Sequence, residues 1–214
     1  MLYLYAVLAR APHGARLRGL AREPVRFLRS GRLVAAVGEV DAAPRPELRN
    51  LKGHDRIVRR LADATRAALP ARFGSLAPTP DALRASLRPR ARALLKALAR
   101  VTDREQMTLR VRTSAREAPT GGPGTRHLRR LAARDPRTHA DVRRLLEDLR
   151  PLVRAEQVEP AADDADAGRI HHLVDRGSAA RYRARVRRAA RGRPGLRVTC
   201  TGPWAPYSFA TEDR

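Results

Sequence analysis

The sequence predicts an α+β protein of two small domains, each a sheet with helices on one side, the C-terminal one ferredoxin-like. Three observations favour this class. Strand-like and helix-like apolar patterns alternate along the chain. From residue 104 onward their order is strand, helices, strand, helix, strand. The chain has 214 residues and 43% hydrophobic content, enough for two small cores. We expect domains at residues 1–102 and 103–202, followed by a docked aromatic tail at 203–214.

The first domain begins with two predicted strands. Residues 2–8 alternate, with Tyr3 and Tyr5 on one face and Leu2, Leu4 and Ala6 on the other. Both faces are apolar, which places this strand inside a sheet. A second strand is expected over residues 33–40, after a turn-like Ser-Gly pair, and a proline-rich loop follows it.

Two helical segments complete the first domain. Residues 47–69 have helical periodicity, and Pro70 is expected to end that helix. Its inward positions are predicted to be Leu51, Ile57, Val58, Leu61 and Ala64.

A second helix opens at Thr79-Pro80-Asp81, because a threonine cap, a first-turn proline and a first-turn acid agree as start features. Pro89 should kink this second helix or divide it in two.

The second domain has a clear alternating strand at residues 106–113, with Met107, Leu109 and Val111 on the buried face. A glycine-rich turn at 121–124 is expected to lead into a basic helix around 126–134.

Another helix should follow Thr138 and end or kink at Pro151. The last elements are a strand at 170–174, a helix at 178–191 and a strand at 196–200. We assign no regular structure to the acidic segment 156–168.

The net charge of +23 indicates a strong positive field that favours acidic partners. Only Lys52 and Lys96 of the 45 basic residues are lysines, and the basic residues are spread along the chain without a dense tract. A nucleic-acid partner is therefore the alternative and not the leading interpretation. No apolar run reaches the length of a membrane span, and the N-terminus lacks signal-peptide features, so we expect a cytoplasmic protein with no membrane partner.

The sequence offers no credible active site, so we expect neither an enzyme nor a cofactor, metal or small-molecule ligand. The glycine-rich run lacks the Lys-Ser/Thr pair of a phosphate-binding loop. His171 and His172 are adjacent and would face opposite sides of a strand. His54 and His139 have no convincing third ligand nearby. We interpret these histidines as surface or satisfied core residues. The single cysteine, Cys200, has no histidine partner nearby in the sequence, so we interpret it as a small buried side chain in preference to a nucleophile.

The C-terminal segment carries the densest pattern, because three of the eight aromatic residues fall within six positions. Glycine and proline restrict the backbone around them. We expect this tail to dock, either on its own protein or on a partner, with Trp204 and Phe209 as buried anchors. The candidate structural or partner-binding residues here are Gly202, Pro203, Trp204, Pro206, Tyr207 and Phe209.

A second candidate segment is Arg72-Phe73-Gly74. A guanidinium beside an aromatic ring and a glycine can hold a turn through stacking and hydrogen bonds to carbonyl oxygens, or it can bind a partner. Both roles would use the same contacts, so the sequence leaves both open.

These segments together resemble the GvpL/GvpF family of gas vesicle accessory proteins. The resemblance runs from end to end and is most specific in the last segment, where Ala205 replaces a usual proline. Its matching positions are residues 2–7, 33–37 with 39–40, His54 with 57–58, 69–74, 122–124 with Leu128, 173–175, 194–196 and 201–209.

The resemblance implies a non-enzymatic role in assembling gas vesicles, the hollow protein shells that give buoyancy. Its implied partners are the hydrophobic major shell protein and other gas vesicle accessory proteins, and its implied location is the gas vesicle. The alternative function is that of an arginine-rich nucleic-acid-binding protein, which would lose affinity steeply with salt.

Overall fold

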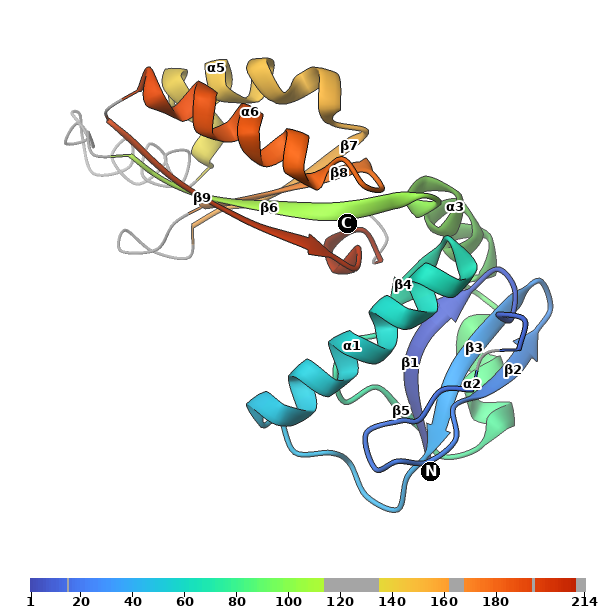
Figure 1. Cartoon of the computed structure of the whole chain (residues 1–214). Helices are drawn as coiled ribbons and strands as arrows, with labels where there is room; N and C mark the ends of the chain where they lie inside the picture. Colours follow the sequence, from blue (N-terminus) through green and yellow to red (C-terminus); the bar gives the residue numbers. More distant parts are fainter. Residues whose placement is uncertain (15, 114–134, 162–167, 194, 211–214) are drawn as a thin grey trace, which may run out of the picture. The chain divides into compact units, whose positions relative to one another are not determined.

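The computed structural model describes all residues except 15, 114–134, 162–167, 194 and 211–214 (Figure 1). The chain forms two compact units. The first comprises residues 1–104 together with the chain from Trp204 onward, and the second comprises residues 105–203. The sequence suggested limits of 1–102, 103–202 and 203–214. Whether each unit folds on its own stays a prediction.

The first unit is built around an antiparallel sheet with β1 (Leu2–Leu8) at its centre. β1 pairs on one side with β3 (Leu33–Glu39) and on the other with the short strands β4 (Ala68–Pro70) and β5 (Leu76–Ala77). β2 (Arg26–Ser30), which the sequence did not reveal, forms a hairpin with β3. The central position predicted for residues 2–8 is confirmed.

A bulge in β1 changes which side chains share a face. The pairing of β1 with β3 shifts register between Leu4 and Ala6, so the alternation restarts after the bulge. As a result Tyr3, Tyr5 and Ala6 all belong to one buried cluster. The sequence-based expectation that Ala6 would face away from the two tyrosines was wrong, because simple alternation assumes a strand without bulges.

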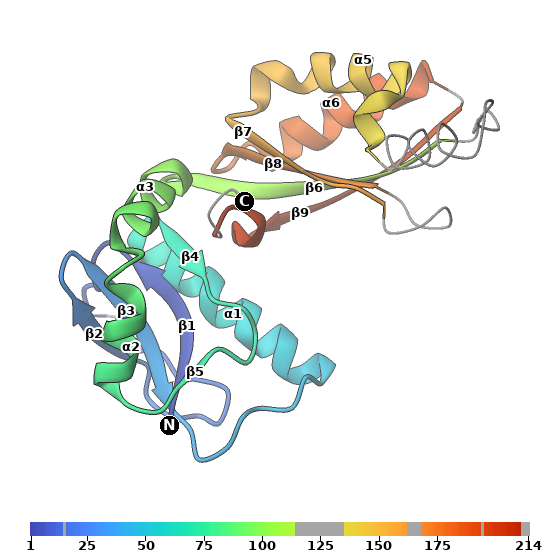
Figure 2. The same ribbon diagram turned by 180° about the vertical axis from the view of Figure 1, so that it is seen from behind.

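Helices cover both faces of this sheet. α1 (Leu48–Thr65) lies over one face, and α2 (Pro80–Leu87) and α3 (Ala91–Val101) lie over the other (Figures 1 and 2). The one-sided arrangement expected for the first domain was therefore wrong. The residues of β1 and β3 are buried on both of their faces, which is what a sheet between two helical layers requires.

The end of α1 also differs from the prediction. The helix stops at Thr65, where Arg66 takes a left-handed conformation with φ 65°, and residues 68–70 form β4 instead of a last helical turn. Ile57, Val58 and Leu61 are buried as predicted, but Ala64 is exposed and Leu51 is 41% exposed. Pairing of β4 with β1 outweighs the helical pattern at these positions.

The α2 and α3 helices form as predicted. The Thr79 side chain accepts a hydrogen bond from the Ala82 amide at 3.1 Å, and Pro80 occupies the first turn. Pro89 lies in the turn that separates the two helices. The proline has divided the segment because it cannot continue the hydrogen-bond ladder of a helix.

The second unit has a ferredoxin-like arrangement. Its chain order is β6 (Arg104–Thr113), α5 (Ala140–Leu149), β7 (Ala155–Glu159), β8 (Gly168–Asp175), α6 (Ala179–Arg191) and β9 (Leu196–Trp204), with short 3-10 turns at Pro136–Thr138 and Arg150–Leu152. The sheet order is β7-β8-β6-β9, and α5 and α6 lie on one face (Figures 1 and 2). The predicted α+β class is confirmed.

One prediction in this unit was wrong, since the segment taken as an acidic linker contributes the strand β7. Its acids have partners on β8: the Glu156 carboxylate lies 3.0 Å from His172 Nε2, and Arg169 donates to Glu159 at 2.9 Å. Cross-strand pairing thus offsets the low intrinsic preference of these acids for a strand. The turn predicted at 121–124 and the basic helix predicted at 126–134 lie outside the described residues.

Candidate functional site

The C-terminal tail docks on the first unit. β9 ends at Trp204, and the turn Tyr207–Phe209 that follows belongs to the first unit. Phe209 is fully buried and Ala205 is nearly so. The Arg100 guanidinium on α3 lies 6.0 Å from the centre of the Phe209 ring. The tail is therefore a part of the first unit's core and not a loose extension of β9.

The tail completes a cluster of rings that we call the aromatic cluster, formed by Tyr3, Tyr5, His54, Phe73 and Tyr207. The Tyr3 ring centre lies 4.8 Å from Tyr5, 5.6 Å from His54 and 6.0 Å from Phe73. The Tyr207 ring lies 6.4 Å from that of His54. These separations are those of tilted and edge-to-face aromatic pairs. The cluster joins β1, α1, the segment after β4 and the tail.

His54 is the polar centre of the cluster. Its Nε2 lies 3.1 Å from the Ala71 carbonyl oxygen and its Nδ1 lies 2.9 Å from the Tyr3 hydroxyl. A carbonyl oxygen only accepts, so Nε2 carries the proton and the Tyr3 hydroxyl donates to Nδ1. Burial lowers the pKa of His54, because the charged ring loses its hydration. Of the two possibilities that the sequence leaves open, a surface or a satisfied core histidine, His54 is the satisfied core histidine.

The tyrosine hydroxyls extend this network to two loops. The Gly74 amide donates to the Tyr3 hydroxyl at 3.3 Å, and burial raises the pKa of Tyr3 to about 12. The Tyr5 hydroxyl donates to Glu23 Oε1 at 2.5 Å and accepts from the Leu20 amide at 2.9 Å. Burial raises the pKa of Tyr5 as well. Sequence reasoning missed Glu23, since a single half-buried acid in a loop carries no pattern of its own.

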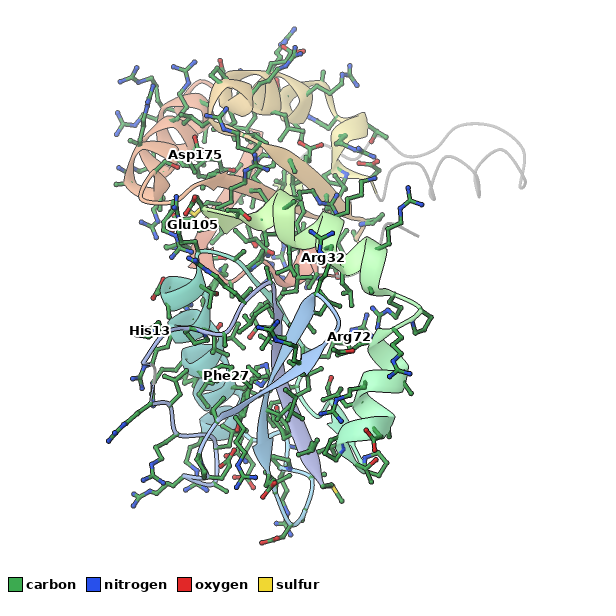
Figure 3. All side chains as sticks on the ribbon, turned by 90° about the vertical axis from the view of Figure 1, so that its right-hand side faces the viewer. His13, Phe27, Arg32, Arg72, Glu105 and Asp175 are labelled. Carbon is green, nitrogen blue, oxygen red and sulfur yellow. The ribbon has the colours of Figure 1, made fainter. Side chains whose placement is uncertain are left out.

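The Arg72-Phe73-Gly74 segment divides its residues between core and surface. Phe73 is half-buried in the aromatic cluster, and Gly74 has φ +83°, a conformation that glycine adopts without strain. The Ser75 amide donates to the Arg72 carbonyl at 3.1 Å and closes the turn. The Arg72 side chain is exposed (Figure 3), and among the described residues it has no hydrogen bond or ion pair. Of the two roles left open by the sequence, a turn held by the Arg72 guanidinium is therefore not what the described residues form, and the partner-binding role stays a prediction.

Trp204 is not the buried anchor that we expected, because its side chain is 39% exposed. The Arg59 guanidinium of α1 lies 4.8 Å from the centre of its ring, and Arg59 Nε donates to Asp55 at 2.8 Å. Phe209 anchors the tail, and Trp204 covers the outside of α1 through a cation–π contact.

Gly202 and Pro203 lie at the end of β9 in the second unit, joined by a cis peptide bond. Gly202 has φ +114°, and a Cβ atom there would lie 2.7 Å from the Gln106 carbonyl oxygen. Arg183 on α6 donates to the Gly202 carbonyl. A side chain at position 202 would meet both backbone strain and a collision. Pro206, the other proline of the tail, is buried.

Packing and hydrogen bonds account for His171 and His172, whereas Cys200 is half-buried and not the buried side chain that the sequence predicts. His171 Nδ1 lies 3.1 Å from the Thr108 hydroxyl, and His172 Nδ1 lies 2.6 Å from the Tyr182 hydroxyl, so the two rings face opposite sides of β8 as predicted. Burial raises the pKa of the Cys200 thiol. No group of three or more His, Cys, Asp or Glu side chains in the described part of the chain could hold a metal ion.

The described residues thus define a two-unit α+β protein whose most distinctive site is an aromatic cluster that gathers both ends of the chain. No helix in the described ranges has both the length and the apolar character needed to cross a membrane. The residues that build the cluster come from segments at 2–7, 54, 69–74 and 204–209. These are the segments that carry the family resemblance.

Comparison with known proteins gives the family. The model of the family "Gas vesicle synthesis protein GvpL/GvpF" matches residues 1–211. The chain is 31% identical to gas vesicle protein L of Streptomyces sp. (strain CB03234), covering 97% of this chain and 92% of that protein. It is 28% identical to gas vesicle protein F of the same strain, covering 97% and 98%. The chain therefore belongs to the GvpL/GvpF family.

Solved structures agree on the fold. The crystal structure of gas vesicle protein GvpF from Anabaena sp. PCC7120 matches 100% of this chain and 97% of its own, with a TM-score of 0.76 at 18% identity. That of GvpF from Microcystis aeruginosa has a TM-score of 0.75 at 15% identity, covering 99% of both chains. Family membership supports a role in gas vesicle formation with protein partners, and the family is not known for enzymes. None of these comparisons supports the nucleic-acid alternative.

Proposed function

We propose that this protein is a non-enzymatic assembly factor that binds the hydrophobic gas vesicle shell protein and other accessory proteins while the vesicle forms. Its membership of the GvpL/GvpF family supports the cellular process. The observation that carries the binding role is an exposed apolar surface on the first unit, which we describe next.

The surface lies along α1 and is formed by Leu48, Leu51 and Trp204, which we call the α1 strip. Leu48 is 66% exposed, Leu51 is 41% exposed and Trp204 is 39% exposed. Positions 48, 51, 55 and 59 share one face of a helix and span about 17 Å. Trp204 extends this face because it stacks on Arg59.

The chemistry of the α1 strip suits an apolar protein partner. A shell subunit that excludes water on its gas side exposes an apolar patch before assembly, and such a patch aggregates unless it is covered. The strip offers two leucine side chains at the start of α1 and, further along the same helix face, the Asp55–Arg59 ion pair with the Trp204 ring against Arg59. Tryptophan and arginine are the residue types that most often dominate binding energy at protein interfaces. The other candidate residues, Phe73, Gly74, Pro206, Tyr207 and Phe209, would then have structural roles in the turn after β4 and in the docked tail.

Co-expression with the major shell protein and the other accessory proteins, followed by affinity purification of this chain, tests the proposal. We expect the shell protein to co-purify with the wild-type chain. Failure of the shell protein to associate in every combination of accessory proteins would contradict the proposed function.

A pair of variants locates the surface. Leu48→Ser combined with Leu51→Ser should weaken the association, because it removes apolar area that only a partner would cover. Leu76→Ser is the control, since Leu76 is 38% exposed in the same unit but belongs to β5 and not to α1. Equal binding by the two variants would show that the α1 strip is not the contact surface.

A further inference from the structure

The helix α6 is unusually rich in arginine and has a narrow buried face. Its sequence carries arginine at positions 181, 183, 185, 187, 188 and 191 and contains no acid. Its buried residues are Ala179, Tyr182, Val186 and Ala189, which belong to the core of the second unit. Most of the helix surface therefore presents guanidinium groups, and a groove lies along each of its two flanks.

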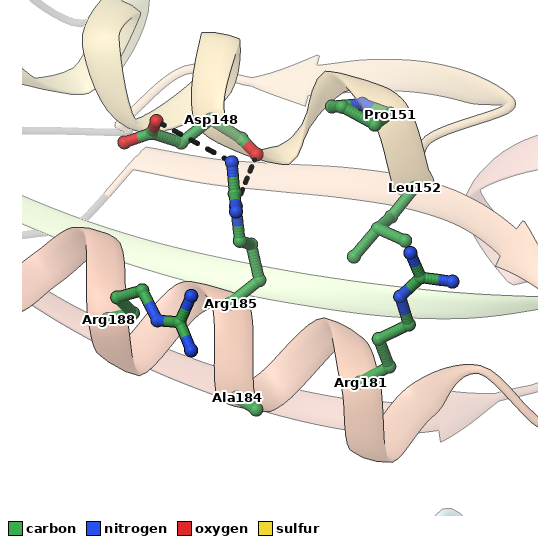
Figure 4. Close-up of a pocket in the computed structure, with 7 residues that line it drawn as sticks. All are labelled: Asp148, Pro151, Leu152, Arg181, Ala184, Arg185 and Arg188. Atoms are coloured by element: carbon green, nitrogen blue, oxygen red, sulfur yellow. Dashed lines mark hydrogen bonds and ion pairs between the residues drawn. The ribbon is translucent and has the colours of Figure 1, made fainter.

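The groove between α5 and α6 contains its own acid (Figure 4). Its volume is about 270 Å³, and Asp148, Arg181, Arg185 and Arg188 are among its lining residues. Arg185 Nε donates to the Asp148 carbonyl at 2.9 Å, and its guanidinium lies 4.0 Å from the Asp148 carboxylate. The positive charge on this flank is partly neutralised within the unit.

On the opposite flank, between α6 and β9, lies a second groove, and none of the described residues that line it is acidic. Its volume is about 500 Å³. It is lined by an apolar floor of Val186, Ala190, Val198 and Cys200 and a basic rim of Arg183, Arg187 and Arg191. We call it the α6–β9 groove.

The outer arginines of this groove are available to a partner. Arg187 and Arg191 are exposed, and within the described ranges neither has an ion pair or a side-chain hydrogen bond. Arg183, at the inner end, donates to the Gly202 carbonyl. The guanidinium groups of Arg187 and Arg191 therefore lie at the rim of a groove with an apolar floor, without an ion-pair partner among the described residues.

We propose that the α6–β9 groove binds an amphipathic helix of a partner protein whose acidic residues repeat every fourth position. Positions 183, 187 and 191 are four residues apart, which places their side chains about 6 Å apart along α6. Acidic residues at i, i+4 and i+8 of a second helix have the same spacing. The adjacent apolar stripe of that helix would cover the floor, as in other helix-in-groove complexes.

The composition of the groove favours this occupant over a nucleic acid. Single-stranded nucleic acids are held by aromatic side chains on which bases stack, and the α6–β9 groove has no aromatic lining residue. Apolar residues form its floor, and phosphates would gain nothing from them. The inference concerns the second unit and does not depend on what binds the α1 strip.

A synthetic peptide of roughly 18 residues tests the groove with the full-length chain, since shorter isolated helices are marginal in water. The peptide carries glutamate at every fourth position and leucine on the adjoining face. We expect it to bind by fluorescence anisotropy, and a scrambled peptide of equal composition to bind much more weakly. Arg187→Ser with Arg191→Ser should weaken binding roughly 5- to 10-fold.

The matched control is Arg181→Ser with Arg188→Ser, which removes the same charge from the other flank of α6. It should bind the peptide nearly as well as the wild type. Cys200 gives an independent measurement, because it is the only cysteine of the chain and lines the groove. Bound peptide should slow its modification by a thiol reagent several-fold.

Three results would overturn the inference: equal binding of the ordered and scrambled peptides, an equal loss in the two double variants, or an unchanged rate of Cys200 modification. A single-stranded oligonucleotide that displaces the peptide and protects Cys200 at lower concentration would also overturn it, in favour of a nucleic-acid ligand.

Discussion

At the scale of single residues, the aromatic cluster depends on one titratable ring that must stay neutral. His54 is buried, accepts from Tyr3 and donates to Ala71, and both ring nitrogens are used by this arrangement. A second proton would leave the Tyr3 hydroxyl without its acceptor and would place a charge among aromatic rings. The cluster is therefore a pH-sensitive part of the core.

Acidification should destabilise the fold through His54. Its folded pKa is lowered, whereas the unfolded ring has a pKa of about 6.5, so the unfolded state binds more protons below that pH. The stabilising contribution is present above about pH 6.5 and is lost as the pH falls through the folded pKa. Urea unfolding at several pH values should show this loss.

His54→Gln should have a weaker pH dependence than the wild type, since glutamine can donate to Ala71 without titrating. Burial also lowers the pKa of His171, so His171 adds the same loss of stability on acidification to the wild type and to the His54→Gln variant. An identical pH dependence in the two proteins would show that His54 does not carry the effect.

The two large rings of the tail should differ in what they contribute to stability. Phe209→Ala should cost about 3–5 kcal/mol, because the ring is fully buried. Trp204→Ala should cost no more than about 1–2 kcal/mol, because its ring is partly exposed and its contact with Arg59 is a surface cation–π pair. Urea unfolding of both variants checks the order, and a larger loss for Trp204→Ala would contradict the packing described above.

At the scale of elements, the start or break of a helix was predictable where neighbouring residues in the sequence cause it. The start of α2 follows from Thr79, Pro80 and Asp81, and the break before α3 follows from Pro89, because each acts on neighbouring backbone groups alone. β7 and β4 could not be predicted in this way. Both segments become strands only because β8 and β1 offer pairing partners.

Removing the cap of α2 tests the local part of this argument. Thr79→Ala should destabilise the first unit by about 0.5–2 kcal/mol, because the Ala82 amide would lose its acceptor. Thr79→Ser keeps the hydroxyl and should change stability little. Thermal unfolding of the two variants gives the comparison, and equal melting temperatures would mean that the cap contributes nothing measurable.

At the scale of the whole molecule, the path of the chain makes the first unit discontinuous. The chain leaves this unit after residue 104 and returns to it at Trp204, so its core needs residues from both ends of the sequence. Tyr207 contacts His54 and Phe209 contacts Arg100, which connects the tail to α1 and to α3.

Truncation after Pro203 should therefore weaken the first unit selectively. We expect faster amide hydrogen exchange in α1 and α3 of the truncated chain, because Phe209 and Ala205 no longer fill the core. Exchange in α5 of the second unit is the internal control and should stay slow. Uniform acceleration in both units would contradict the assignment of the tail to the first unit.

Local patterns were enough to predict the α+β class, most helices and a docked aromatic tail, because periodicity, capping residues and ring density are local properties, and motif resemblance was enough to predict the family. Only the tertiary structure decided that Trp204 is half exposed and Phe209 buried, that helices cover both faces of the first sheet, and that His54 meets Tyr3 and Tyr207. These outcomes depend on contacts between residues far apart in the sequence, such as that between the rings of His54 and Tyr207. No local pattern records such contacts, since they exist only once the chain has folded and water has left the space between them.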